Sequence, residues 1–219
     1  MGAGGVSVPA GTCYSFSMNN PLLARRYWVF DLDGTLTVPA HDFAAIRKRL
    51  CIPEEADILA YIDSRENGER ARLRKLLDEI EGEVCAIARP AQGASHLMEV
   101  LRRRGARVGI LTRNTRDIAA RTLSAIGIGG YFEPDCILGR DEAAPKPDPD
   151  GIFRLGFRWS ASAADMVMVG DYLFDLQAGR SAGAATVHVD QSARFRWPHL
   201  TDLPVATPGA LAAMVAASP

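Results

Sequence analysis

The sequence predicts an α/β fold: a doubly wound parallel sheet with a small helical insertion after its first strand. From Ala91 onward, short apolar runs alternate with segments of helical period, the pattern of parallel strands joined by covering helices. Between Thr37 and Pro90 no strand pattern occurs, and three helical segments follow one another. These two observations predict a sheet formed by residues 25–37 and 91–219, interrupted by an insertion at 38–90.

The elements follow from local start and stop signals. The first strand is the apolar run Tyr27–Phe30, and the residues before it, 1–24, are expected to form a flexible extension. Three helices are expected in the insertion, at 41–50, 54–64 and 66–89, with Pro53 starting the second and Pro90 ending the third. The remaining expected strands are 107–112, 135–138, 166–169 and 185–189, and the remaining expected helices are 92–104, 115–126, 148–157, 174–182 and 208–217.

Composition and charge exclude several classes of protein. The 219 residues are 47% hydrophobic with a net charge of −1, so no global basic field attracts nucleic acid or a membrane surface. No apolar run is long enough to span a bilayer, and the N-terminal residues lack a signal-peptide pattern, so a cytoplasmic protein is expected. The four cysteines show no metal-binding spacing and are expected to be reduced thiols.

Polar residues gather at the predicted strand ends. The candidates are Asp31 and Asp33, then Thr112, Arg113 and Asn114, then Lys146, and finally Asp171 and Asp175. Because ligands of doubly wound sheets bind at the carboxyl ends of the strands, these side chains are expected to share one crevice.

This set of residues suits phosphoryl transfer. Crowded carboxylates repel one another, which calls for a hard divalent cation such as Mg²⁺. An ionised aspartate can attack phosphorus, and a second one two residues later can exchange protons with the leaving group and with water. Thr112 and Lys146 can bind the phosphate oxygens, with Arg113 and Asn114 as neighbours.

Four motifs, in order, resemble those of the haloacid dehalogenase (HAD) superfamily, most of whose members are Mg²⁺-dependent phosphatases with a Rossmann-like core. Asp31-Leu32-Asp33-Gly34-Thr35 is similar to the first motif, Thr112 after its strand to the second, and Lys146 to the third. Gly170-Asp171-x-x-x-Asp175 is similar to the fourth. The helical insertion resembles the small cap of the phosphoglycolate-phosphatase-like branch.

The resemblance implies a role for each matched residue. Asp31 would be the nucleophile and Asp33 the general acid/base, while Thr112 and Lys146 would bind phosphate. The Mg²⁺ ligands would be Asp31, the backbone carbonyl of Asp33, and Asp171, with Asp175 as a further ligand or a support. The superfamily's dehalogenases lack the second acid of the first motif and need no metal; the presence of Asp33 therefore favours phosphoryl chemistry.

The predicted function is hydrolysis of a small phosphomonoester through an aspartyl-phosphate, by a monomer or homodimer. A phosphomutase, a phosphonate hydrolase or a non-catalytic binding protein on the same core stay open as alternatives. A signalling receiver domain is disfavoured, because the strand before Thr112 carries no aspartate and receivers are about half this length. His41, at the start of the insertion, is left open between packing and substrate contact, and most arginines of the insertion are expected to be solvated.

Overall fold

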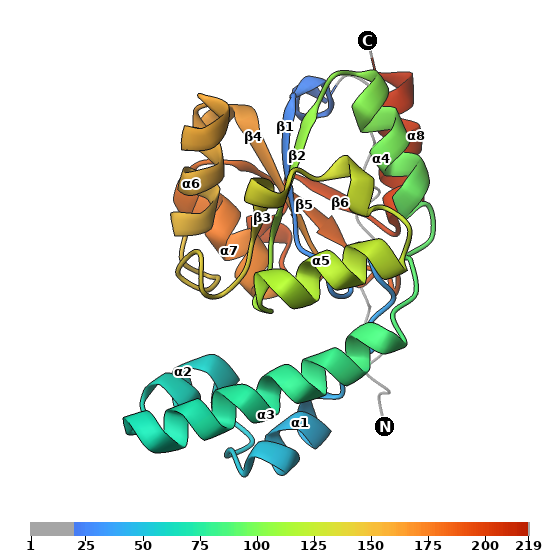
Figure 1. The fold of residues 1–219 in the computed structure, drawn as a ribbon. Helices are drawn as coiled ribbons and strands as arrows, with labels where there is room; N and C mark the ends of the chain where they lie inside the picture. The colour runs from blue at the N-terminus through green and yellow to red at the C-terminus, as the bar shows by residue number, and fades with distance from the viewer. Residues whose placement is uncertain (1–19, 219) are drawn as a thin grey trace, which may run out of the picture.

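The computed structural model describes residues 20–218, drawn in Figure 1. Most of the predicted N-terminal extension, and Cys13 with it, lies outside the described residues. The last part of the extension was predicted to be flexible, but Pro21–Ala24 forms a short 3-10 helix, η1. Leu22 and Leu23 of this helix are buried among the residues of the main hydrophobic core, because both side chains are apolar and η1 contacts the C-terminal helix.

Six parallel strands form one sheet in the order β3-β2-β1-β4-β5-β6. The strands are β1 (Tyr27–Phe30), β2 (Arg107–Leu111), β3 (Ile137–Leu138), β4 (Met166–Gly170), β5 (Ala185–Val189) and β6 (Leu203–Val205). The predicted fold class is therefore confirmed. Two details differ from the prediction: β3 is shorter, because Pro134–Cys136 is a 3-10 helix, and β6 was not predicted.

Helices cover both faces of the sheet (Figure 1). They are α4 (Ala94–Arg103), α5 (Arg116–Ala125), α6 (Asp150–Trp159), α7 (Leu173–Ala182) and α8 (Pro208–Ala217), with further 3-10 helices at Gly129–Tyr131, Ala163–Asp165 and Pro198–Leu200. Side chains alternate along β1. Trp28 and Phe30 pack in the hydrophobic cluster shared with α4, α5 and α8, whereas Val29 packs in the cluster shared with α6 and α7.

The helical insertion lies to one side of the sheet and has its own core (Figure 1). Its helices are α1 (Phe43–Leu50), α2 (Ile58–Asp63) and α3 (Asn67–Ala86). Pro53 does not start α2 as predicted, because the side chain of Asp57 accepts a bond from Ala60 N at 3.0 Å and caps the helix there. The third helix ends at Ala86, before the predicted stop at Pro90.

Two further observations bear on the sequence predictions. Cys51, Cys85 and Cys136 are free thiols. Among residues 20–218, no helix combines the length and the apolar character that crossing a bilayer requires.

Candidate active site

The neighbouring strands β1, β2 and β4 bring three of the predicted motifs together. Phe30 is paired with Ile110 on one side and with Val169 on the other. The residues that follow these strands, Asp31, Thr112 and Asp171, therefore lie along one edge of the sheet. Backbone bonds extend the pairing just past the strand ends: Asp31 N donates to Val169 O at 2.9 Å, and Thr112 N donates to Leu138 O at 3.0 Å.

Lys146 joins this edge from the loop before α6. Its Nζ lies 2.6 Å from an oxygen of Asp31 and 2.6 Å from an oxygen of Asp175, and its side chain is 2% exposed. Burial alone would lower the pKa of Lys146, but the two carboxylates raise it above its ordinary value. The ammonium is therefore a fixed positive charge between two acids.

Three carboxylates crowd around this charge. Asp31, Asp171 and Asp175 can each offer an oxygen within 4.8 Å of the others. Burial, helped by the neighbouring carboxylates, raises the pKa of Asp31 to about 7 and that of Asp171 to about 8. Asp31 Oδ2 is buried and has no hydrogen-bond partner among residues 20–218. Three buried or half-buried carboxylates that can each offer one oxygen to a common point suit a hard cation, so these residues fit Mg²⁺.

Gly34 shapes the same corner. Its φ is +86°, and a Cβ at this position would lie 2.3 Å from Asp171 Oδ2. Only glycine therefore allows the turn after Asp33 to lie against the Asp171 carboxylate. Thr35 supports the arrangement, since its hydroxyl lies 3.4 Å from the other oxygen of Asp171, at the long limit for a hydrogen bond.

Asp175 is already held on both sides. One of its oxygens pairs with Lys146, and the other accepts a bond from Tyr172 N at 3.0 Å at the start of α7. Of the two roles that the resemblance implies for Asp175, these contacts favour a support for Lys146 over a direct ligand.

Asp33 stands apart from the three crowded acids. Its Oδ2 accepts a bond from Asn114 Nδ2 at 2.8 Å, and its Oδ1 lies 3.8 Å from His41 Nδ1. Burial raises the pKa of Asp33, although His41, Lys146 and Asn114 act against the rise. A carboxyl group with a raised pKa, oriented by an amide, can both donate and accept a proton.

The three predicted residues of the segment after β2 do not all face the carboxylates of the site. Thr112 is buried, and its hydroxyl oxygen accepts a bond from Asn114 N at 3.2 Å. Asn114, predicted as a substrate-binding residue, holds Asp33 through its side chain. Arg113 does not point at the carboxylates: both oxygens of Asp57 in the helical insertion accept bonds from its Nη2 at 2.7 Å, and its guanidinium lies 5.0 Å from the centre of the Phe174 ring.

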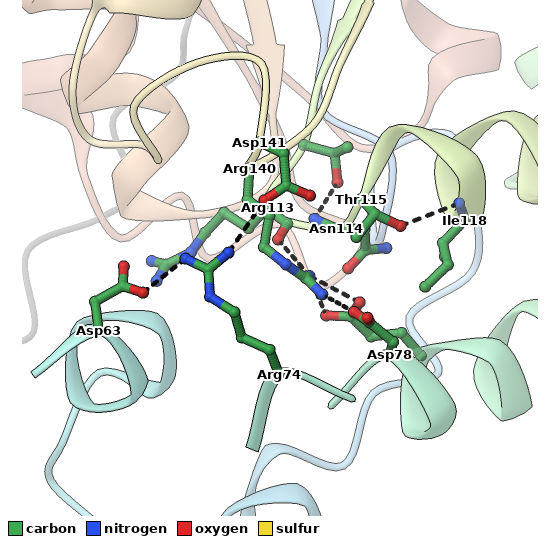
Figure 2. Close-up of polar contacts among 11 residues, drawn as sticks. Asp63, Arg74, Asp78, Arg113, Asn114, Thr115, Ile118, Arg140 and Asp141 are labelled. Carbon is green, nitrogen blue, oxygen red and sulfur yellow. Dashed lines mark hydrogen bonds and ion pairs between the residues drawn. The ribbon is translucent and has the colours of Figure 1, made fainter. Parts of the chain in front are cut away.

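Sequence reasoning missed Arg140, Glu81 and Asp57. Arg140 follows β3 by two residues and binds Glu81 of α3, beside the segment that carries Asn114 (Figure 2). The sequence did carry a signal for Arg140. It comes shortly after the end of a strand, and residues at that place lie along the edge of a parallel sheet where ligands bind. The acidic partners carry no such signal, since they sit in a helical segment rich in charged residues.

Comparison with known proteins places the chain in a family. Residues 27–183 match the haloacid dehalogenase-like hydrolase family. The chain belongs to that family. A haloacid dehalogenase-like hydrolase domain-containing protein of Arabidopsis thaliana is 30% identical over 182 residues, 76% of this chain and 71% of that protein. A phosphoglycolate phosphatase of Pseudomonas fluorescens is 28% identical over 187 residues, 74% of this chain and 68% of that protein.

A solved structure agrees with the fold of this haloacid dehalogenase-like hydrolase. A hydrolase from Pseudomonas syringae superposes with a TM-score of 0.73 at 21% identity, covering 85% of this chain and 96% of that one. The family match confirms the superfamily and the hydrolase class expected from the four motifs.

Proposed function

We propose that this hydrolase is a phosphatase that cleaves a small phosphomonoester through an aspartyl-phosphate on Asp31. The observation that carries the proposal is the environment of Asp31. One of its oxygens is fixed by Lys146, and the other is buried without a partner among the described residues, beside Asp171. A carboxylate held in this way keeps one oxygen available for attack on phosphorus. The named phosphatase among the relatives supports the same chemistry.

In the first step, an oxygen of Asp31 attacks phosphorus, and the bond from phosphorus to the leaving oxygen breaks. Asp33 donates its proton to that oxygen, so the leaving group departs as an alcohol. Lys146 and Thr112 bind the oxygens of the phosphoryl group, where negative charge gathers in the transition state. Burial raises the pKa of Asp33, which favours the protonated form that this step uses.

In the second step, water attacks the phosphorus of the aspartyl-phosphate. Asp33, now ionised, takes a proton from the water, and the bond between phosphorus and the Asp31 oxygen breaks. Phosphate leaves, and both aspartates return to their starting forms. Asn114 keeps the Asp33 carboxyl in one orientation for both proton transfers.

Mg²⁺ is the cation that we propose for the three carboxylates. Asp31 and Asp171 would hold it, with the backbone carbonyl of Asp33 as the resemblance implies and Asp175 as a support. When bound, Mg²⁺ neutralises the crowded acids and draws negative charge from the phosphate oxygens.

We also propose that the helical insertion, residues 38–90, is a cap over the site. The substrate is then a small phosphorylated molecule whose leaving group fits between the cap and the sheet. The phosphoglycolate phosphatase relative makes a short phosphorylated acid a natural first compound to test. A cytoplasmic location and a monomer or homodimer stay predictions.

The proposal is tested by measuring phosphate release from a panel of small phosphomonoesters, with Mg²⁺ and with EDTA. We expect turnover that requires Mg²⁺ and falls to the background rate in Asp31→Asn, because an amide cannot form the intermediate. Release that persists in Asp31→Asn would refute the covalent mechanism. The absence of release from every ester, with the fold intact, would favour a binding role.

The raised pKa values predict how stability depends on pH in EDTA. Asp31, Asp171 and Glu81 have pKa values of about 7, 8 and 7, far above their values in the unfolded chain. The folded protein therefore holds protons that the unfolded chain has lost, and the free energy of unfolding falls as the pH rises from about 6.5 to 8.5. We expect a fall of about 1–3 kcal/mol by urea unfolding.

Two controls separate the site from the rest of the protein. Mg²⁺ should offset most of the loss at the upper pH, raising the melting temperature by about 2–8 °C. Asp31→Asn should flatten the pH dependence in EDTA, because one of the carboxyl groups with a raised pKa is gone. Asp57 and Asp190, whose pKa values are lowered, titrate below this range, whereas His188, whose pKa burial lowers from 6.5, offsets part of the fall at the lower end. A flat profile for the unmodified chain would contradict the prediction.

A further inference from the structure

The helical insertion has a hydrophobic core of its own, and it meets the rest of the protein where the chain crosses and where α3 lies against α5. The hydrophobic cluster of the insertion is separate from the two clusters that flank the sheet. The chain crosses between them at two adjacent points, where Thr37 bridges Pro90 and Val38 N donates to Arg89 O at 2.9 Å. Because none of the three hydrophobic clusters spans this boundary, polar contacts across it help to decide how the insertion sits over the site.

Ion pairs cross this boundary (Figure 2), and the pair of Arg140 with Glu81 is far more buried than the others. Arg140 Nη1 lies 2.9 and 2.8 Å from the two oxygens of Glu81, and Nη2 binds Asp78 one turn earlier on α3. The side chains of Arg140 and Glu81 are 4% and 7% exposed. The pairs of Arg74 with Asp141 and of Arg113 with Asp57 also cross the boundary, but their side chains are 25% to 50% exposed, so solvent weakens them.

The same arginine contacts the segment that carries Thr112 and Asn114. Arg140 Nη1 donates to Arg113 O at 3.0 Å, and Arg140 N donates to Asn114 O at 2.9 Å. Gly139 allows this approach, since a Cβ there would lie 2.6 Å from Asn114 O. The side chain of Asn114 in turn holds Asp33. A continuous set of contacts therefore runs from α3 to the carboxyl group of Asp33.

We propose that Arg140 is a positioning residue that couples the docking of α3 to the orientation of Asp33. The inference rests on the proposed function, because it assigns the orientation of the acid/base in that reaction. Arginine suits this role because its planar guanidinium donates in several directions at once, here to two acids of the insertion and to a carbonyl of the site segment. Without Arg140, α3 loses its buried tie to the sheet, and Asn114 loses part of the support that fixes its side chain.

The test compares two phosphate monoesters that differ in their leaving group. An alkyl phosphate needs its leaving oxygen protonated by Asp33, whereas a nitrophenyl phosphate leaves readily without that proton. In Arg140→Gln we expect the rate of the first step, measured as release of the leaving group in a single turnover, to fall about 10–100-fold on the alkyl ester, the size of effect that a small misplacement causes. On the nitrophenyl ester we expect less than about a threefold loss in the rate of this first step, because hydrolysis of the intermediate, which also uses Asp33, is not part of the single-turnover measurement. A purely structural role would lower both rates equally and would refute the proposal.

Two further variants guard against a simple folding defect. Arg140→Gln leaves Glu81 buried without its partner, which destabilises a protein, so the double variant Arg140→Gln/Glu81→Gln removes both charges. The double variant should show the same loss of rate on the alkyl ester, but its melting temperature should be close to that of the unmodified chain. Arg49→Gln is the matched control: Arg49 makes a two-bond pair with Glu83, also on α3, but that pair lies within the insertion. It should leave both rates unchanged.

A measurement independent of activity separates this inference from the proposed function. In Arg140→Gln, amide hydrogen exchange should speed up in α3 and in residues 112–116, and in Arg49→Gln the exchange at 112–116 should stay as it was. Unchanged exchange at 112–116 in Arg140→Gln would overturn the coupling even if the enzyme is active. The unmodified chain could also cleave no ester while exchange still becomes faster in Arg140→Gln. That combination would support the docking role of Arg140 and would refute the proposed phosphatase function.

Discussion

Asp33→Asn is expected to lower kcat on an alkyl phosphate about 10²–10⁴-fold, the usual contribution of a positioned general acid/base. The amide oxygen that replaces the carboxylate can still accept the bond from Asn114, so the geometry of the site should survive. What is lost is the proton for the leaving oxygen and, in the second step, the base for the attacking water.

The two steps can be observed separately with a nitrophenyl phosphate. Its leaving group needs little protonation, so Asp31 should still be phosphorylated in Asp33→Asn, while hydrolysis of the intermediate becomes slow. We expect a burst of nitrophenolate equal to the enzyme concentration, followed by slow turnover, and a protein mass increased by one phosphoryl group. Asp31→Asn is the control and should show neither. Steady turnover without a burst, at a rate close to that of the unmodified chain, would mean that Asp33 is not the acid/base.

The part of the site that could be predicted from the sequence is the part that a parallel sheet dictates. Asp31, Thr112 and Asp171 each follow an apolar strand, and parallel pairing brings such positions to one edge. Lys146 was grouped with these strand-end residues, but it lies in the loop between β3 and α6, so its place in the order of motifs was the stronger pointer to it. The structure places Lys146 and Asp171 directly around the Asp31 carboxylate.

The orientations of Arg113 and Asn114 could not be predicted in the same way. Both stand beside Thr112 in the sequence, and either could have faced phosphate. Asn114 instead binds Asp33, and Arg113 turns to Asp57. The contact of Arg113 with Asp57 depends on where the helical insertion sits against the sheet, which no local pattern encodes.

Tertiary contacts that no local pattern encodes also explain two errors in the predicted secondary structure. The start of α2 lies at Ile58 and not at residue 54, because Asp57 caps the helix and its carboxylate also binds Arg113. The strand Leu203–Val205 was missed because it is three residues long and contains a proline, which sheets tolerate at an edge such as this one. In both places tertiary contacts outweigh the local signal.

Lys146→Met tests whether the buried positive charge holds the site together. Methionine has a similar length and no charge, so the substitution leaves Asp31 and Asp175 without the ammonium that lies 2.6 Å from each. Removing one partner of a buried ion pair typically costs about 3–5 kcal/mol. We expect a loss of this size in the free energy of urea unfolding at pH 8.5 in EDTA.

The loss should depend on pH, and this dependence distinguishes charge from packing. Without Lys146, the pKa of Asp31 rises further above its value of about 7, so near pH 6.5 the carboxyl takes up a proton and no longer needs a cation. The variant should therefore recover much of its stability there, and partly also with Mg²⁺ at pH 8.5. Arg158→Met, which breaks an exposed pair with Asp135, should cost less than about 1 kcal/mol at either pH. An equal loss for Lys146→Met at both pH values would show that its stem, and not its charge, stabilises the site.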